Sequence, residues 1–165
     1  MLSGLCSSHE SFLWSALFDV TRDGKKIPAV AQRTKQGLLF IFNRLTGEPI
    51  YKVEGREIIS DNPVPGYKNW PTQPVPVKPP PLARMTFQPE DIAKVTPEHE
   101  AYCKSLLAME GGALGGGPYG QYGPKLRVHF PGWVGGGNWS PPAFNPDSGS
   151  RHNAQRETVD EAVSG

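Results

Sequence analysis

Residues 26–43 read KIPAVAQRTKQGLLFIFN and give the main evidence for the fold class. Two short apolar runs, residues 26–32 and 37–43, flank a polar connection at residues 33–36, which is the pattern of a β-hairpin. The second run is continuously apolar, so we expect both of its faces to be covered, as in stacked sheets. The sequence therefore predicts a mainly β protein built around this hairpin.

A further strand is expected directly before this hairpin. Residues 16–20 read ALFDV and are followed by TRDGK at residues 21–25. Asp23 and Gly24 provide the positive φ angles that a tight hairpin turn needs. Three strands in succession predict an antiparallel meander.

A short phrase occurs both at the end of the meander and near the end of the chain. Residues 42–47 read FNRLTG and residues 144–149 read FNPDSG. In such a phrase the Asn side chain can bond backbone N–H groups ahead of it, the hydroxyl adds a second local bond, and Gly takes the left-handed position. Recurrence of a strand and turn at long spacing indicates a radial β-repeat architecture, with a coincidence of turn chemistry as the alternative.

The composition excludes several classes of protein. Gly (19) and Pro (18) interrupt nearly every window long enough for a helix, which excludes a coiled coil and disfavours a large α/β enzyme. The formal net charge of +1, without a Lys/Arg run, gives no sign of nucleic-acid binding. No apolar stretch is long enough to span a membrane, and residues 1–17 lack the basic region of a signal peptide. Cys6 and Cys103 match neither a disulfide framework nor a zinc site.

Residues 60–84 are rich in proline. They cannot form a central strand or a helix, because proline lacks the backbone N–H donor that both structures need. We expect a rigid loop that Tyr67 and Trp70 pin across the folded surface. A polyproline ligand for an SH3-like partner is the alternative, which the spacing of the prolines before Arg84 disfavours.

Residues 87–110 hold the only helical pattern in the sequence. Thr96 is expected to be the N-cap and Pro97 the first helical residue, and the glycines at 111–112 stop the helix. Cys103 lies on its apolar face and is interpreted as a core residue rather than a nucleophile, because the sequence places no base beside it.

The last patterned stretch is residues 125–131, whose alternation predicts a half-buried strand with His129 on the polar face. The glycines at 135–137, followed by Asn138 and Trp139, let the backbone approach something flat and closely packed. They do not follow the GxGxxG spacing, which excludes a phosphate loop. Residues 150–165 are polar without a strand pattern, and we expect a disordered tail.

Together these stretches resemble the pyrroloquinoline quinone (PQQ) dependent dehydrogenases, most closely the membrane-bound glucose/quinate/shikimate group. The resemblance rests on residues 23–40, DGKKIPAVAQRTKQGLLF, and on residues 43–50, NRLTGEPI. GGPYGQYG at 116–123 and GGGNW at 135–139 support it. It divides the chain into a divergent N-terminal segment (1–16), a partial dehydrogenase propeller (17–149) with a Pro-rich and helical insertion (60–115), and the tail (150–165).

The resemblance implies an eight-bladed β-propeller with PQQ on its axis. A blade takes about 40–45 residues, so this chain would hold two to three blades. Lys35 is then the lysine that reaches the quinone carbonyls of PQQ, where its ammonium can stabilise the charge that develops as the quinone accepts hydride. Asn138 and Trp139 match a segment that lines or supports the cofactor region, with plain packing as the alternative for Trp139. Tyr51 stands where the family's Trp docks between blades.

The same resemblance implies an oxidoreductase. The complete enzyme would use PQQ with Ca²⁺ or Mg²⁺ to oxidise the C–OH group of a sugar or polyol, glucose-type, and would pass electrons to membrane ubiquinone at the periplasmic face of the inner membrane. The family's general base and metal-binding carboxylates have no match in this sequence. We therefore predict an internal fragment without catalytic or metal-ligating residues that is inactive alone; a non-catalytic, propeller-derived binding scaffold is the alternative.

Overall fold

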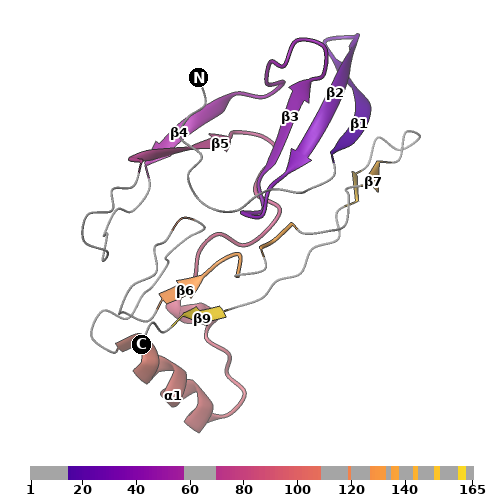
Figure 1. Ribbon diagram of the computed structural model, residues 1–165. Coiled ribbons are helices and arrows are strands. Elements are labelled where there is room, and N and C mark those ends of the chain that lie inside the picture. Colours follow the sequence, from indigo (N-terminus) through magenta and orange to yellow (C-terminus); the bar gives the residue numbers. More distant parts are fainter. Residues whose placement is uncertain are drawn as a thin grey trace.

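The computed structural model of the chain describes residues 15–57, 70–108, 119, 127–132, 135–137, 143–144, 151–152 and 160–162. These residues are mainly β, in small antiparallel sheets with one α-helix, as the sequence predicts (Figure 1). The elements in chain order are β1 (Ala16–Arg22), β2 (Lys25–Arg33), β3 (Leu39–Asn43), β4 (Val53–Glu57), β5 (Thr72–Pro76), the 3₁₀ helix η1 (Pro89–Asp91), α1 (Pro97–Ala108), β6 (Arg127–His129), β7 (Ala143–Phe144), β8 (Arg151–His152) and β9 (Asp160–Ala162).

The predicted meander is confirmed, since β1, β2 and β3 form one antiparallel sheet in sequential order. Asp23 and Gly24 form the first turn, with φ angles of 51° and 73°. On the other face of β3, Phe40 and Phe42 are only half-buried, so the expected cover of both faces is incomplete. The buried face and the segment after β3 supply the core: Phe18, Ala29, Ala31, Leu39, Ile41 and Ile50.

The turn after β3 has the local bonds that its sequence predicts. The Leu45 backbone N–H donates to Asn43 Oδ1 over 2.9 Å, and the Glu48 N–H donates to Thr46 Oγ1 over 3.3 Å. Gly47 takes the left-handed conformation, with a φ of 77°. The similar phrase that ends at residue 149 lies almost wholly outside the described residues.

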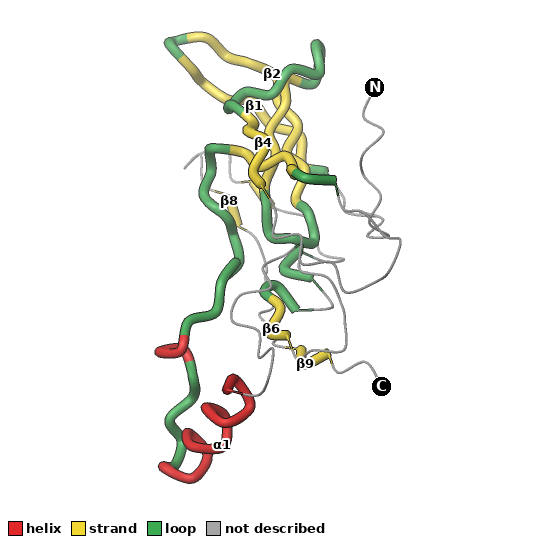
Figure 2. The backbone as a smooth tube through the Cα atoms, turned by 90° about the vertical axis from the view of Figure 1, so that its left-hand side faces the viewer, coloured by secondary structure: helices red, strands yellow, loops and turns green. Residues whose placement is uncertain are grey.

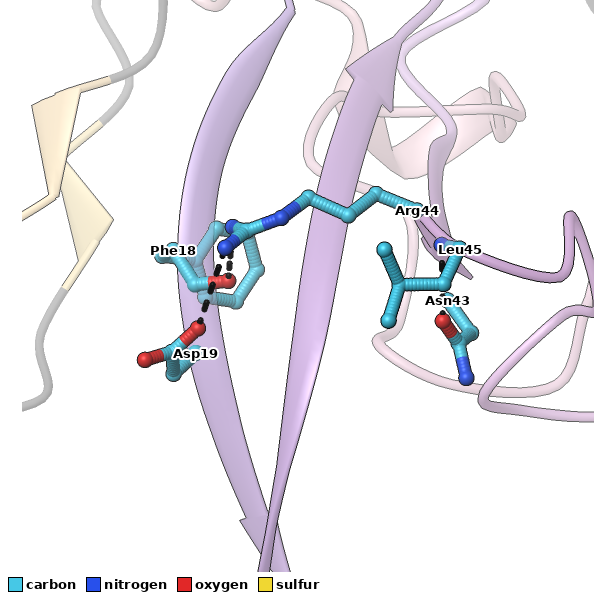
Figure 3. Close-up of polar contacts among 5 residues, drawn as sticks. All are labelled: Phe18, Asp19, Asn43, Arg44 and Leu45. Atoms are coloured by element: carbon cyan, nitrogen blue, oxygen red, sulfur yellow. Dashed lines mark hydrogen bonds and ion pairs between the residues drawn. The ribbon is translucent and has the colours of Figure 1, made fainter.

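Arg44 ties this turn to the first strand (Figure 3). Its guanidinium reaches over β2, and Nη1 lies 3.4 Å from the carbonyl oxygen of Phe18. Nη2 lies 3.7 Å from the Asp19 carboxylate. Tyr51, which the resemblance predicts to stand where the family's Trp docks between blades, packs half-buried against the same core. The meander is therefore fastened across all three strands by a side chain as well as by its core.

The Pro-rich region contributes a strand. β5 pairs antiparallel with β4 in a two-stranded sheet, where each strand is an edge and Pro74 needs no N–H partner on its outer side. The expectation of a loop pinned by Trp70 is wrong, because this side chain is 64% exposed. Tyr67 lies outside the described residues.

The predicted helix is present as α1. The His99 backbone N–H donates to Thr96 Oγ1 over 3.1 Å, which confirms Thr96 as the N-cap. The expectation that Cys103 fills a core is wrong, because no residue of α1 is buried. The helix and the meander lie at opposite ends of the described structure in both views (Figures 1 and 2). Among the described residues, no helix combines the length and apolar character that crossing a bilayer requires.

Short strands complete the structure. β6 pairs with β9, and β7 pairs with β8. The sequence shows no strand pattern after residue 149, but the structure places β8 and β9 there. The expected exposure of His129 is wrong, because its side chain is 5% exposed and both of its neighbours, Val128 and Phe130, are buried as well. The alternation of polar and apolar residues here does not give His129 a solvated face, because three successive residues, 128–130, are buried.

Candidate functional site

The connection between β2 and β3 forms a tight turn that presents Lys35. The Gly37 N–H donates to the Thr34 carbonyl over 3.0 Å, and the Thr34 N–H donates to the Leu38 carbonyl over 2.8 Å. The Leu38 N–H also donates to Thr34 Oγ1 over 3.2 Å. Gly37 has a φ of 78°, which favours glycine. Lys35 therefore lies, half-buried, at a central position of a turn held by both backbone and side-chain bonds.

The glycine run at 135–137 covers this turn. The Gly136 N–H donates to the Lys35 carbonyl over 2.7 Å. A Cβ atom on Gly135 would lie 2.8 Å from Lys35 Cβ, and one on Gly137 would lie 2.5 Å from Arg33 Nε. No real Cβ fits at such distances, so the close backbone approach that the glycines predict is confirmed, and its partner is the Lys35 turn.

A third segment, from the end of the Pro-rich region, packs against the Lys35 turn and the glycine run. The Leu82 N–H donates to the Gly37 carbonyl over 2.7 Å. Cβ atoms on Gly37 and Gly136 would lie 2.6 and 2.9 Å from Ala83 Cβ. Residues 33–38, 82–83 and 135–137 thus meet without space for an added methyl group, and we call these three segments the turn junction.

The turn junction contains one buried arginine, and a second arginine that follows it contacts an aromatic ring. Arg33 is 1% exposed, and this burial lowers the pKa of its guanidinium from the ordinary value. Next to Ala83, Arg84 lies 5.1 Å from the centre of the Phe130 ring and 3.4 Å from the Asp91 carboxylate. Phe87 stacks on Phe130 with ring centres 6.0 Å apart. These contacts join the segment that follows Ala83 to Phe130, a few residues before the glycine run.

The structure describes one of the three predicted cofactor contacts, Lys35. Asn138 and Trp139 lie outside the described residues, although they directly follow Gly137, whose backbone packs on the turn. Sequence reasoning missed Arg33. Its position could have been inferred, because Ala29, Ala31 and Arg33 alternate along β2 and share its buried face.

The described part of the chain has no group of three or more His, Cys, Asp or Glu side chains that could hold a metal ion. The turn junction itself is cationic and closely packed, with Lys35 half-buried and Arg33 buried.

Comparison with known proteins identifies the class. Residues 14–160 match the family described as "PQQ: Glucose/ethanol/alcohol dehydrogenase, beta-propeller domain". The chain belongs to this family of quinoprotein dehydrogenase propellers, as its sequence motifs predict. No solved structure matches the chain significantly.

Two relatives show which dehydrogenases of this family the chain is similar to. The chain is 33% identical over 127 residues to the quinate/shikimate dehydrogenase (quinone) of Acinetobacter baylyi, a match that covers 76% of this chain and 15% of the relative. It is 30% identical over 131 residues to the glycerol dehydrogenase large subunit of Gluconobacter thailandicus, covering 77% and 17%. The chain therefore spans less than a fifth of the length of these relatives.

Proposed function

We propose that this chain forms two to three blades of an eight-bladed propeller and part of the wall of a PQQ site. The whole enzyme would oxidise a C–OH group of a sugar, polyol or related hydroxy compound and pass electrons to a quinone. The family and the quinone named for the Acinetobacter relative support this chemistry. The relatives are named for glycerol and quinate rather than glucose, so they favour a polyol or cyclic hydroxy acid over a glucose-type substrate.

The observation that carries the proposal is the packing of residues 135–137 on the Lys35 turn. It holds the backbone of Lys35 through its carbonyl and the side-chain stem through contact at Gly135. It also begins the segment that continues directly into Asn138 and Trp139. The three proposed cofactor contacts therefore come from two segments that are bonded to each other.

The turn junction, together with Asn138 and Trp139 that follow it in the sequence, provides the kinds of side chain that a bound quinone needs. PQQ, when bound, supplies a quinone that takes up hydride from the substrate carbon. The Lys35 ammonium would donate a hydrogen bond to a quinone oxygen and stabilise negative charge there. The Trp139 ring offers a flat apolar surface and the Asn138 amide a donor and an acceptor. Buried Arg33 adds positive charge behind the turn.

Other parts of the enzyme would supply the remaining functions. The general base and the ligands of a Ca²⁺ or Mg²⁺ ion would come from other blades of the propeller, because the family's motifs for these groups have no match in this sequence. From the resemblance to membrane-bound dehydrogenases we infer a position at the periplasmic face of the inner membrane, with ubiquinone as the electron acceptor. The quinone named for the Acinetobacter relative supports the kind of acceptor.

The cofactor role is tested by titrating PQQ with Ca²⁺ into the purified chain and following the fluorescence of its four tryptophans. We expect saturable quenching that Lys35→Ala weakens by about tenfold or more in apparent affinity, because a charged hydrogen bond to the cofactor is lost. Lys25→Ala is the matched control, since Lys25 is an exposed lysine beside the turn between β1 and β2. This variant should bind PQQ with the same apparent affinity as the parent.

Two outcomes would contradict the proposal. Lys35→Ala and Lys25→Ala could bind equally well, which would remove Lys35 from the site. The parent chain could fail to quench although circular dichroism shows it folded, which would favour the propeller-derived, non-catalytic scaffold instead.

A further inference from the structure

A thiol and an imidazole lie side by side on α1, at the opposite end of the structure from the turn junction. Cys103 Sγ is 3.8 Å from His99 Nε2 and 3.9 Å from His99 Nδ1. The two residues are four apart, a spacing that places them on the same face of a helix. Both distances are within hydrogen-bonding range for sulfur.

A backbone carbonyl from another segment orients the imidazole. His99 Nδ1 lies 3.2 Å from the carbonyl oxygen of Ala93, which precedes the helix. A carbonyl only accepts hydrogen bonds, so this contact places the ring proton on Nδ1. Nε2 then keeps its lone pair and is the atom that can take the proton of Cys103. A nucleophile, a base and a group that orients the base are thus present in hydrogen-bonding order.

The surroundings leave the pair accessible. His99 is exposed and Cys103 is half-buried, on a helix with no buried residue. One turn before Cys103, the Glu100 carboxylate is 2.6 Å from Lys104 Nζ. This ion pair reduces the repulsion that a free carboxylate would exert on a thiolate or on an anionic reagent. A small reagent can therefore reach the sulfur.

We propose that Cys103 and His99 form a reactive pair that exchanges with small soluble disulfides. The thiol proton passes to His99 Nε2, and the sulfur attacks one sulfur of the disulfide with its electron pair. The S–S bond breaks and its second sulfur leaves as a thiolate, so the Cys103 sulfur is oxidised and the leaving sulfur is reduced. The product is a mixed disulfide on the surface of α1. This modification site is independent of the proposed PQQ role.

The test uses the full chain with Cys6→Ser, which leaves Cys103 as its only thiol. The reagent is the chromogenic disulfide 5,5′-dithiobis(2-nitrobenzoate), in the presence of EDTA so that metal ions do not alter the rate. Released thionitrobenzoate gives the rate, and intact mass confirms the adduct. We expect His99→Ala to slow the reaction by about tenfold, because the group that accepts the thiol proton is removed.

Controls separate the imidazole's role from changes in the helix. Ser105→Ala removes a neutral side chain from the same helix and should leave the rate within about twofold of the parent. Circular dichroism checks that His99→Ala keeps its helix, and His99→Gln repeats the test with a side chain of similar size. The proposal is overturned if both His99 variants react as fast as the parent. It is equally overturned if the native parent reacts no faster than the chain unfolded in denaturant.

Discussion

The meander and the helix arm (residues 89–108) hold chemical groups in place by different means. In the meander, the Lys35 turn is held by segments that are distant in the sequence. The buried core and the backbone hydrogen bonds of Leu82 and Gly136 hold it in place. In the helix arm, cap bonds and i, i+4 spacing position the side chains, and buried Ile92 anchors the arm. Long-range packing therefore governs the first region and local helix geometry the second, so substitutions in one should leave the other unchanged.

The largest expected difference concerns the core of the meander. Ile41 is 3% exposed in the centre of the core, so Ile41→Ala should reduce the free energy of unfolding by about 2–5 kcal/mol. Leu106 on α1 is a half-buried aliphatic side chain, so Leu106→Ala should reduce the free energy of unfolding by less than about 1 kcal/mol. Urea denaturation followed by tryptophan fluorescence measures both. Equal losses would show that α1 packs into a core after all.

The next difference lies between two glycines with similar backbone strain. Gly135 and Gly24 have φ angles of 84° and 73°, so alanine is strained at both, by about 1 kcal/mol. A Cβ on Gly24 meets nothing, whereas one on Gly135 would overlap Lys35. Gly135→Ala should therefore reduce the free energy of unfolding by about 1–3 kcal/mol more than Gly24→Ala.

The PQQ titration of these two variants connects stability to the proposed site. Gly135→Ala should weaken quenching, because the glycine run at 135–137 must move away from Lys35. Gly24→Ala should bind PQQ like the parent. If Gly24→Ala is the more damaging substitution in either assay, the turn junction is not packed as described.

The parts of the fold that the sequence predicts are those set by local chemistry. Asp23 and Gly24 define a turn by their own φ angles, Asn43 and Gly47 bond within their turn, and Thr96 caps the helix beside it. Each outcome depends on residues within a few positions of each other. The family phrase around Lys35 likewise lies within one hairpin. The family match confirms the family that this phrase indicates.

The parts that sequence reasoning missed depend on distant partners. No residue near His129 in the sequence indicates that its side chain is buried. The glycines at 135–137 predict a close backbone approach but do not indicate that the Lys35 turn is the segment they approach. The proline spacing also does not indicate that Trp70 is 64% exposed, because exposure is set by the packing of the folded chain. The pair of His99 and Cys103 is different, since its four-residue spacing on a predicted helix was a readable signal.

The smallest expected effect is the response of the helix arm to acid. The hydrogen bond from Lys104 lowers the pKa of Glu100 from its ordinary value, with the Lys104 charge also contributing. Its own backbone N–H and the Thr96 hydroxyl lower the pKa of Glu98. A carboxylate whose pKa is lower in the folded state stabilises that state above its unfolded pKa, and the stabilisation is lost as the pH falls through the folded value.

Helicity should therefore decline modestly as the pH falls below about 4, near the ordinary pKa of Glu. The far-UV circular dichroism signal measures it, and Glu100→Gln should remove part of the decline because its side chain no longer titrates. Glu48→Gln in the meander turn is the control and should leave the decline unchanged, since Glu48 lies outside the helix arm. Because Glu98 is exposed and Glu100 is only half-buried, added salt should weaken the effect through screening. A Glu100→Gln chain that titrates like the parent would mean that its ion pair with Lys104 does not support the helix, and that only capping and Ile92 hold the arm in shape.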